Sequence, residues 1–245
     1  MTQPWHYQAG PLQVTLRPLP DACWAVQHWM GVDESTPLQQ RALLSALREA
    51  LPVEHTLMVD DHRSAAVLRW LQEGGLQTVR CKYLYEKQPL GTPVLPQTEL
   101  IFCSLAELGE DRFLSYLIEA ATDDPEASAA TSPEQEYQEL LAHAGEAFDP
   151  HAWGVVFLGE QAVGVLLPQV FFDKPSEGTL SYLGVMPDFR GKGYGALLHQ
   201  WGLHLLAQQG VTRYIGSTGH KNIAMQRVFE RNGCRRLAAR YFLGF

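Results

Sequence analysis

Apolar residues recur at three- and four-residue steps in several stretches of the chain, and this spacing predicts amphipathic helices. The expected helices span residues 36–51, 63–73, 112–121, 133–148, 196–206 and 222–231. Thr36 and Ser132 precede two of them and are suited to cap their N-termini. Gly74 and Gly75 follow the second helix and are expected to end it.

Short apolar runs between these helices predict β-strands. The expected strands span residues 11–17, 55–59, 76–85, 99–104, 153–158, 162–172, 179–186, 214–217 and 235–243. Gly159 and Glu160 separate two of these runs and predict a hairpin, whereas residues 173–178 are polar and are expected to form a loop.

A proline-rich stretch at residues 89–97 is the best candidate for a linker, and it predicts two domains, residues 1–95 and 96–245. Residues 64–76 can be overlaid on residues 222–234 without a gap, and both copies read as a helix, a glycine stop and a strand. We hypothesise that the N-terminal domain is a degenerate, partial copy of the C-terminal one. Chance similarity is the alternative, because the identities are few.

The composition is that of a globular protein, with 46% hydrophobic and 19% charged residues. No apolar run approaches the roughly 20 residues needed to cross a membrane, and the first residues lack the basic start and apolar core of a signal peptide. The four cysteines are scattered without a C-x-x-C pair. These features predict a cytoplasmic protein with reduced thiols and no membrane association.

The charge pattern excludes some classes of partner. A net charge of -8 argues against a nucleic-acid-binding surface. Acidic residues gather between Glu99 and Asp149, where Arg112 is the single Lys or Arg. This pattern is typical of a solvated helical face, and the alternative is an acidic wall that attracts a cationic amine. The histidines form no H-E-x-x-H or comparable cluster, so no metal site is expected.

A glycine-rich segment lies between the apolar strand at 179–186 and the helix that follows it. It comprises Arg190, Gly191, Lys192, Gly193, Tyr194 and Gly195. Backbone N–H groups at a helix N-terminus lack partners within the helix, and the helix dipole adds positive charge there. Glycines allow a phosphate to approach such a backbone closely. The spacing differs from nucleotide P-loops and from dinucleotide-binding loops, so a pyrophosphate site of another kind or a purely structural turn is predicted.

This segment, preceded by an apolar strand that ends in Val185-Met186-Pro187, resembles a known coenzyme signature. Arg190, Gly193 and Gly195 match the Arg/Gln-x-x-Gly-x-Gly/Ala acetyl-coenzyme A motif of the GNAT (GCN5-related N-acetyltransferase) superfamily. The expected order of elements over residues 98–245 is also similar to the GNAT order. The resemblance implies an α+β fold in which helices flank a mixed, mostly antiparallel central sheet, with the N-terminal part as a smaller α/β partial repeat.

The resemblance further implies an acetyl-CoA-dependent N-acetyltransferase. Such an enzyme transfers the acetyl group directly to a primary amine of a small molecule or peptide within a ternary complex, and acetyl-CoA is its cosubstrate. The residues implied to contact the coenzyme are Leu183, Val185, Arg190, Gly191, Lys192, Gly193, Tyr194, Gly195, Asn222 and Phe229. Gly184 marks either a bulge or close backbone approach, or tight packing against a neighbour. The alternative function is a non-catalytic acyl-CoA-binding or protein-interaction module, and both a monomer and a homodimer remain open.

The catalytic groups are less clearly marked. An alkylamine is mostly protonated at neutral pH, so a general base or a water chain leading to one is needed. The candidates by position are Glu177, Tyr182, His220 and, less directly, Asp173. Phe229 occupies the place where the family commonly has a tyrosine that acts as general acid, and it has no proton to give. We expect Phe229 to pack in the core, so water or another tyrosine (Tyr194, Tyr214 or Tyr241) would protonate the leaving thiolate, or activity is weak.

Overall fold

The computed structural model describes residues 3–19, 22–51, 54–91, 95, 99–123 and 132–245. Much of the predicted linker at 89–97 and of the polar stretch between Asp123 and Ser132 therefore lies outside the described residues. The contacts divide the chain into two compact units. The first comprises Met1–Leu84 and Leu237–Phe245, and the second comprises Tyr85–Arg236. These divisions fall within two strands and not at the predicted boundary after residue 95.

The second unit contains a mixed, mostly antiparallel sheet, as the resemblance implied. Its strands are β6 (Leu100–Ser104), β7 (Gly154–Leu158), β8 (Gln161–Phe171), β9 (Lys174–Val185) and β10 (Arg213–Gly219). They lie in the order β10-β9-β8-β7-β6. All neighbouring pairs are antiparallel except β9 and β10, which run parallel.

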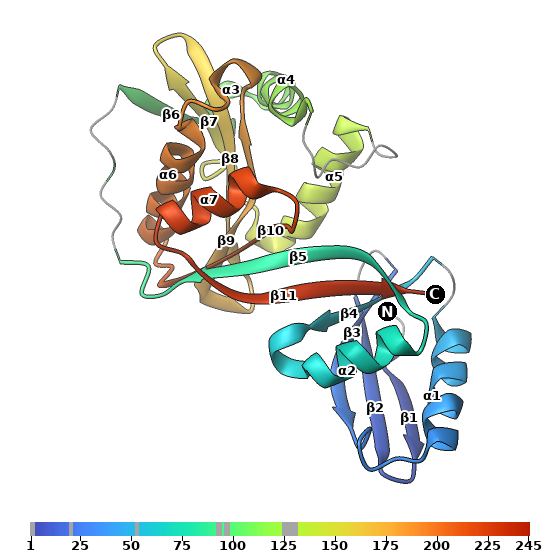
Figure 1. Ribbon diagram of the computed structural model, residues 1–245. Coiled ribbons are helices and arrows are strands. Elements are labelled where there is room, and N and C mark those ends of the chain that lie inside the picture. Colours follow the sequence, from blue (N-terminus) through green and yellow to red (C-terminus); the bar gives the residue numbers. More distant parts are fainter. Residues whose placement is uncertain (1–2, 20–21, 52–53, 92–94, 96–98, 124–131) are drawn as a thin grey trace. The chain divides into compact units, whose positions relative to one another are not determined.

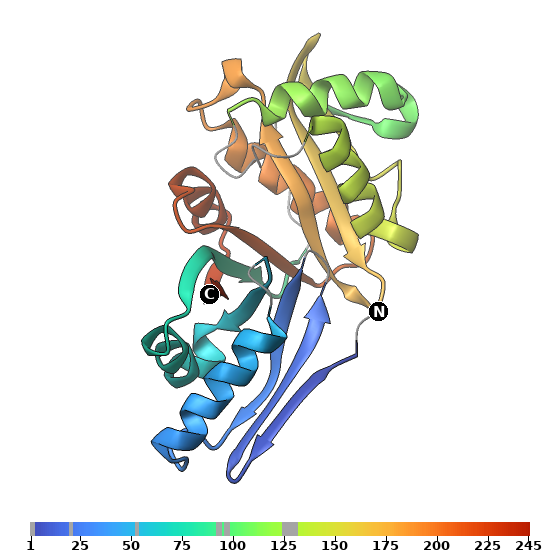
Figure 2. The ribbon, with the colours of Figure 1, turned by 90° about the vertical axis from the view of Figure 1, so that its right-hand side faces the viewer.

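Helices cover both faces of this sheet (Figures 1 and 2). They are α3 (Leu105–Leu108), α4 (Glu110–Ala121), α5 (Pro133–Ala144), α6 (Tyr194–Gln208) and α7 (Ile223–Arg231). On one face, Phe113 of α4 packs in a cluster with Val155, and on the other, Leu198 of α6 packs in a cluster with Val156. Neighbouring strand residues point to opposite faces, so this pair of valines divides between the two layers. Each fully buried side chain of this size contributes about 1.5–3 kcal/mol to folding.

Local sequence sets the start of α5 and its end. The Ser132 hydroxyl accepts a hydrogen bond from the Gln135 N–H, and the Gln135 side chain accepts one from the Ser132 N–H. This capping box begins the helix where the sequence predicted. The helix ends at Ala144 and not at the predicted residue 148, because Gly145 has a left-handed φ of 52° and a short 3-10 turn follows.

The first unit has a smaller sheet of the same mixed type. Its strands are β1 (Trp5–Ala9), β2 (Leu12–Leu19), β3 (Cys23–Met30), β4 (Thr56–Asp60) and the end of β11 (Arg235–Gly244), in that order. Strands β3 and β4 run parallel, and the other pairs are antiparallel. Two helices, α1 (Pro37–Ala50) and α2 (Asp61–Glu73), complete the unit, and β5 (Gln77–Lys87) leads from it into the second unit. Strands β1 and β3 escaped the sequence analysis because exposed polar residues interrupt their apolar positions.

The two units share their order of elements, which supports the repeat hypothesis. The first unit runs β3-α1-β4-α2-β5, and the second runs β9-α6-β10-α7-β11. In each copy a glycine N–H bonds the carbonyl three residues earlier, and the next N–H bonds the carbonyl five residues earlier. These bonds are 2.9–3.1 Å long and join Gly75 to Gln72, Leu76 to Leu71, Gly233 to Glu230 and Cys234 to Phe229. The paired positions are those that the gapless overlay aligns, and the shared origin of the two units stays a hypothesis.

The predicted loop at residues 173–178 is wrong. Strand β9 begins at Lys174, which pairs with Phe171 across a tight turn. The first three side chains of the strand are exposed to solvent. Their polarity suggested a loop, but Lys174 pairs with Phe171 of β8 and Glu177 pairs with Arg213 of β10, so the strand extends through this stretch.

Candidate coenzyme site

Strands β9 and β10 pair along only a short part of their length. Their parallel register contains two pairs, Arg213 with Glu177 and Tyr214 with Gly178, although both strands are described throughout. Beyond Gly178 the facing edges of the two strands are not joined to each other. Unpaired edges of this kind can accept an extended ligand as an additional strand-like partner.

The ladder between β8 and β9 determines which residues of β9 face this opening. The Met186 N–H bonds the Val163 carbonyl at 2.9 Å, so the next residue pair along the ladder has backbone groups that point away from each other. That pair contains Val185. The next pair of the same kind contains Leu183, two residues earlier on β9. Leu183 and Val185 therefore direct their N–H and C=O groups toward the opening, the orientation required by the predicted coenzyme contact.

A β-bulge lies deeper in the same opening. Leu167 pairs with Tyr182 but Pro168 pairs with Leu180, which leaves Ser181 as the extra residue on β9. Pro168 has no N–H for the ladder, so the bulge accommodates it. The Ser181 hydroxyl donates to the Gln169 side-chain carbonyl. The sequence analysis had considered a bulge at Gly184, and a proline inside an apolar strand was the signal that could have located it correctly.

Gly184 is explained by tight packing. A Cβ on this residue would lie 2.6 Å from the Tyr182 hydroxyl oxygen and 2.9 Å from the Ala120 Cβ of α4. The side chain of Tyr182 thus lies over Gly184, on the α4 side of the sheet. Its role as a general base stays a prediction.

The glycine-rich loop connects β9 to α6 and leaves the start of that helix open. Gly191 and Gly193 have φ values of 72° and 88°, a region that favours glycine. A Cβ on either residue would meet no atom within 4 Å, so the backbone is accessible from outside. Gly193 is the N-cap and supplies no side-chain cap. Within the described residues, the backbone hydrogen bonds of standard geometry include none donated by the N–H groups of residues 191–195.

The start of α1 shows what a closed helix terminus looks like in the same chain. Thr36 and Gln39 form a capping box there, and Pro37 removes one N–H donor. Asp33 and Glu34 precede the helix and would repel an anion, whereas Lys192 precedes α6. The open, cationic terminus is therefore a specific property of the second unit.

The side chain of Arg190 faces inward. Its Nε donates to the Val185 carbonyl at 3.0 Å, and its Nη2 donates to the carbonyls of Ala120 at 3.1 Å and Thr122 at 2.6 Å. These acceptors are the end of β9 and the last turn of α4, where a cation also complements the helix dipole. Arg190 thus fixes the loop between two elements, whereas Lys192 is exposed to solvent.

Two predicted residues lie at the turn between β10 and α7. Asn222 is the N-cap of α7, because its Oδ1 accepts a hydrogen bond from the Met225 N–H at 3.1 Å. His220 is exposed, and its backbone carbonyl accepts a bond from the Gln226 side chain at 2.9 Å. Contacts of Asn222 with the coenzyme and proton transfer by His220 stay predictions.

Glu177 lies where β9 and β10 pair with each other, and not in the opening between them. Its Oε1 accepts a hydrogen bond from Arg213 Nη1 at 2.8 Å, and its Oε2 lies 3.8 Å from Lys174 Nζ. Arg213 also donates to the buried carboxylate of Glu86, which pairs with Arg235 as well. The structure therefore places Glu177 in an ion-pair network at the closed end of the two strands.

Phe229 packs in the core, as expected. It is 1% exposed, its ring stacks on Tyr85 with centroids 4.6 Å apart, and the edge of His199 meets it at 5.3 Å. Burial lowers the pKa of His199 to about 3, so this imidazole is neutral. Its Nδ1 lies 3.0 Å from Asn232 Nδ2, which holds the ring in place beside Phe229.

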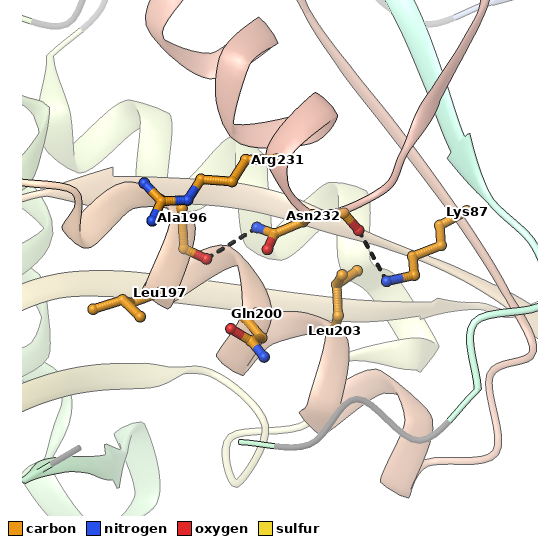
Figure 3. A pocket seen from close by; sticks show the side chains of 7 residues that line it. All are labelled: Lys87, Ala196, Leu197, Gln200, Leu203, Arg231 and Asn232. Atoms are coloured by element: carbon orange, nitrogen blue, oxygen red, sulfur yellow. Dashed lines mark hydrogen bonds between the residues drawn. The ribbon is translucent and has the colours of Figure 1, made fainter. Parts of the chain in front are cut away.

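A separate pocket of 440 Å³ lies beside α6 and the end of α7 (Figure 3). It is lined by Lys87, Ala196, Leu197, Gln200, Leu203, Arg231 and Asn232. Lys87 donates to the Asn232 carbonyl at 2.9 Å and so caps the C-terminus of α7. None of the predicted coenzyme-contacting residues lines this pocket.

Two absences concern the described residues only. Within them, no group of three or more His, Cys, Asp and Glu side chains could hold a metal ion. The described helices also include none that is long and apolar enough to cross a membrane.

Comparison with known proteins identifies the class to which this fold and loop belong. The family model "Acetyltransferase (GNAT) family" matches residues 114–234, which include both strands of the opening, the glycine-rich loop and α7. The chain belongs to the GNAT superfamily through this second unit. No curated protein sequence matches the chain.

Solved structures of the same fold extend over nearly the whole chain. A GCN5-related N-acetyltransferase from Sphaerobacter thermophilus has 17% identity and a TM-score of 0.66, covering 95% of this chain and 76% of its own. One from Kribbella flavida has 16% identity and a TM-score of 0.56, with coverages of 98% and 89%. A tandem GNAT protein from the clavulanic acid biosynthesis pathway has 13% identity and a TM-score of 0.52, with coverages of 96% and 80%. At these identities the likeness shows the fold.

Proposed function

We propose that this protein is an acetyl-CoA-dependent N-acetyltransferase that acts on a primary amine. The observation that carries the proposal is the open N-terminus of α6. Its N–H groups lie just after the unpaired edge of β9 in the chain. Together they offer an anion site and a strand-like edge in the order in which a pyrophosphate and an amide-containing chain occur in the coenzyme. The family model supports the acetyl group as the transferred unit.

Each part of the site has a distinct task in this proposal. The N–H groups of residues 191–195 and the charge of Lys192 hold the pyrophosphate. The edge of β9 at Leu183 and Val185 pairs with the pantetheine arm, and a backbone N–H near Val185 polarises the thioester carbonyl. Arg190 keeps the loop aligned with β9. The amine then attacks the carbonyl carbon within a ternary complex, the carbon–sulfur bond breaks, and neither a metal nor a covalent enzyme intermediate is needed.

The acceptor in this proposal is cationic. Acidic residues lie on α4 and α5, on the face of the sheet opposite α6. They are exposed or half-buried and include Glu110, Asp111, Glu119, Glu134, Glu136 and Glu139. Such a surface raises the local concentration of a protonated amine. A small-molecule or peptide amine with a second positive charge is the acceptor class that fits. We place the reaction in the cytoplasm, which agrees with the four free cysteines.

A non-catalytic acyl-CoA-binding module is the second candidate. Two observations favour it: Phe229 has no proton to donate, and Glu177 is occupied by Arg213. The two functions share the coenzyme site and differ only in turnover.

Calorimetric titration with acetyl-CoA and with free coenzyme A tests the shared site. Saturable binding of both is expected, and absence of binding at millimolar coenzyme would refute both functions. A panel of mono- and polyamines, assayed for release of the coenzyme thiol, then separates them. Acetylation of any amine supports the enzyme, and binding without turnover over the whole panel supports the module.

A further inference from the structure

The pocket beside α6 takes no part in the proposed acetyl transfer. All of its lining residues belong to the second unit, and none of them lies on β9 or in the glycine-rich loop (Figure 3). Helix α6 covers one face of the sheet, and the acidic helix α4 covers the other. The pocket volume of 440 Å³ falls within the range of about 300–1,000 Å³ that is typical of small-molecule sites. The chemistry of the lining therefore indicates which ligand fits.

One side of α6 forms the apolar part of the lining. Ala196, Gln200 and Leu203 follow one another at steps of four and three residues, so they share one face of the helix. Leu197 lies three residues before Gln200 and widens this face. Ala196 and Leu203 are buried, and Leu197 is half-buried. This surface suits the apolar body of a ligand.

Two cationic side chains supply the charge of the pocket. Lys87 comes from the end of β5, and Arg231 comes from the last turn of α7. The described residues that line the pocket include no Asp or Glu, and the ion pairs among the described residues include neither Lys87 nor Arg231. The whole chain has a net charge of -8, so this cationic lining is a local exception. Charge complementarity therefore favours an anionic ligand.

The ammonium group of Lys87 is held in place by a single hydrogen bond to the end of α7. Its Nζ donates to the Asn232 backbone carbonyl at 2.9 Å (Figure 3). A lysine ammonium group has three N–H donors, and this cap uses one of them. Burial and then the charge of Lys87 lower the pKa of the neighbouring His199 to about 3. The positive field of Lys87 thus extends over this wall of the pocket, where it suits an oxyanion.

Asn232 joins the two helices that form the wall of the pocket. Its Nδ2 donates to the Ala196 carbonyl at 2.9 Å and lies 3.0 Å from His199 Nδ1. These contacts fix the end of α7 against the first turn of α6 without a ligand. The pocket is therefore preformed, and a preformed site pays less ordering entropy when a ligand binds.

We propose that this pocket binds a small organic oxyanion, a carboxylate or phosphate on an apolar body, as a second ligand beside the coenzyme. Lys87 and Arg231 hold the oxyanion, and Leu197 and Leu203 contact the apolar body. The ligand is distinct from the acceptor, since the proposed acceptor is a cation that is attracted to the opposite face of the sheet. Binding in this pocket does not depend on the proposed function.

Calorimetric titration of the full chain with three aromatic probes tests the proposal. Benzoate carries a carboxylate, phenyl phosphate carries a phosphate, and benzamide is an uncharged molecule with the shape of benzoate. We expect saturable binding of at least one anion, at least about tenfold tighter than benzamide, the scale of a hydrogen bond to a charged group. Tighter binding of benzoate would identify a carboxylate as the natural group, and tighter binding of phenyl phosphate a phosphate. No saturable binding of either anion, or equal affinity for benzamide, would overturn the proposal.

Two variants locate the bound probe. Lys87→Met removes the ammonium group and should weaken binding of the anion about tenfold. Arg231 is exposed, so Arg231→Met should weaken it only about threefold. The matched control is Lys192→Met, which removes an exposed cation from the glycine-rich loop and should leave the affinity unchanged. Thermal unfolding shows whether each variant folds, and Arg231→Met decides alone if Lys87→Met does not. Unchanged affinity in the folded pocket variants, or a loss confined to Lys192→Met, would contradict the assignment.

Coenzyme A separates this pocket from the coenzyme site. The titrations are repeated with protein that is saturated with coenzyme A, and the affinity for the probe should stay nearly unchanged. Displacement of the probe by coenzyme A would assign the pocket to the coenzyme site and would overturn the proposal of a second ligand. If coenzyme A does not bind the wild type, the proposed function fails, whereas the titrations without coenzyme still decide whether the pocket binds an anion.

Discussion

Replacing Arg190 with alanine separates two roles that the coenzyme motif alone does not distinguish. The guanidinium donates hydrogen bonds to the carbonyls of Val185, Ala120 and Thr122. A hydrogen bond made by a charged group contributes about 1.5–3 kcal/mol, but Arg190 is half-buried and water can replace it at the exposed carbonyls. We therefore expect Arg190→Ala to destabilise the protein by about 2–4 kcal/mol in total, well below the sum of three separate bonds.

Thermal unfolding measures this loss directly. For a protein of this size, each kcal/mol corresponds to about 2–4 °C, so a decrease of the midpoint by about 6–12 °C is expected for a loss of 3 kcal/mol. Acetyl-CoA affinity should also fall, because the loop loses its tie to β9 and α4. Since the lost bonds lie inside the protein, the ratio of wild-type to variant affinity should depend little on salt between 50 and 300 mM, about the range over which exposed charges become screened.

The opposite pattern would refute this reasoning. If the midpoint stays within 1–2 °C, about the scale of a surface substitution, while affinity falls strongly and mainly at low salt, then Arg190 contacts the phosphates directly. Lys192→Ala is the matched control, because Lys192 is exposed on the same loop. It should leave the midpoint unchanged and weaken coenzyme binding in a salt-dependent way.

Three further substitutions test other parts of the structure. Gly193→Tyr should abolish acetyl-CoA binding in calorimetry, because a side chain would fill the open approach to the α6 N-terminus and L-residues pay about 1–2 kcal/mol at a left-handed position; retained binding would contradict the loop assignment. Glu86→Ala should lower the free energy of unfolding by about 2–4 kcal/mol, because it leaves the partly buried guanidinium of Arg213 without one of its carboxylates. A lower urea midpoint would report this loss, and an unchanged midpoint would show that the network contributes no stability. His199→Leu should flatten the pH dependence of stability: the folded pKa of His199 is about 3 against an ordinary 6.5, so the unfolded chain gains a proton that the folded one does not, and stability falls as the pH decreases from 6.5 toward 3. Between pH 7 and pH 5 the wild type should lose about 2 kcal/mol more than the variant, and equal losses in chemical denaturation would contradict the neutral, buried imidazole.

The local features of the fold could be predicted because their causes lie within a few residues of one another. The capping boxes at Thr36 and Ser132 join side chains three positions apart, and the apolar spacing of α6 is visible within one helix. The open start of that helix follows from Gly191 and Gly193 in the same way. The motif that led to the superfamily is also local, since it spans a single strand–loop–helix segment.

The features that could not be predicted depend on contacts between distant parts of the chain. Glu177 was considered as a base from its position before the central strand, but its carboxylate bonds Arg213, 36 residues later. The extension of β9 to Lys174 required pairing with β8, and the bulge at Ser181 required Pro168 on the neighbouring strand. None of these partners is identifiable from the residue's own surroundings in the sequence.

The sequence by itself determined the superfamily, the positions of most helices and the loop suited to a pyrophosphate, because side-chain spacing and backbone conformation encode these over short distances. The tertiary structure decided what individual side chains do. It turned Arg190 toward the carbonyls of Ala120 and Thr122, about 70 positions earlier in the chain, and brought the Tyr214 hydroxyl of β10 beside the Phe229 ring of α7. Hydrogen bonds and packing act over a few ångströms in space, and only the folded chain fixes which residues lie within that distance.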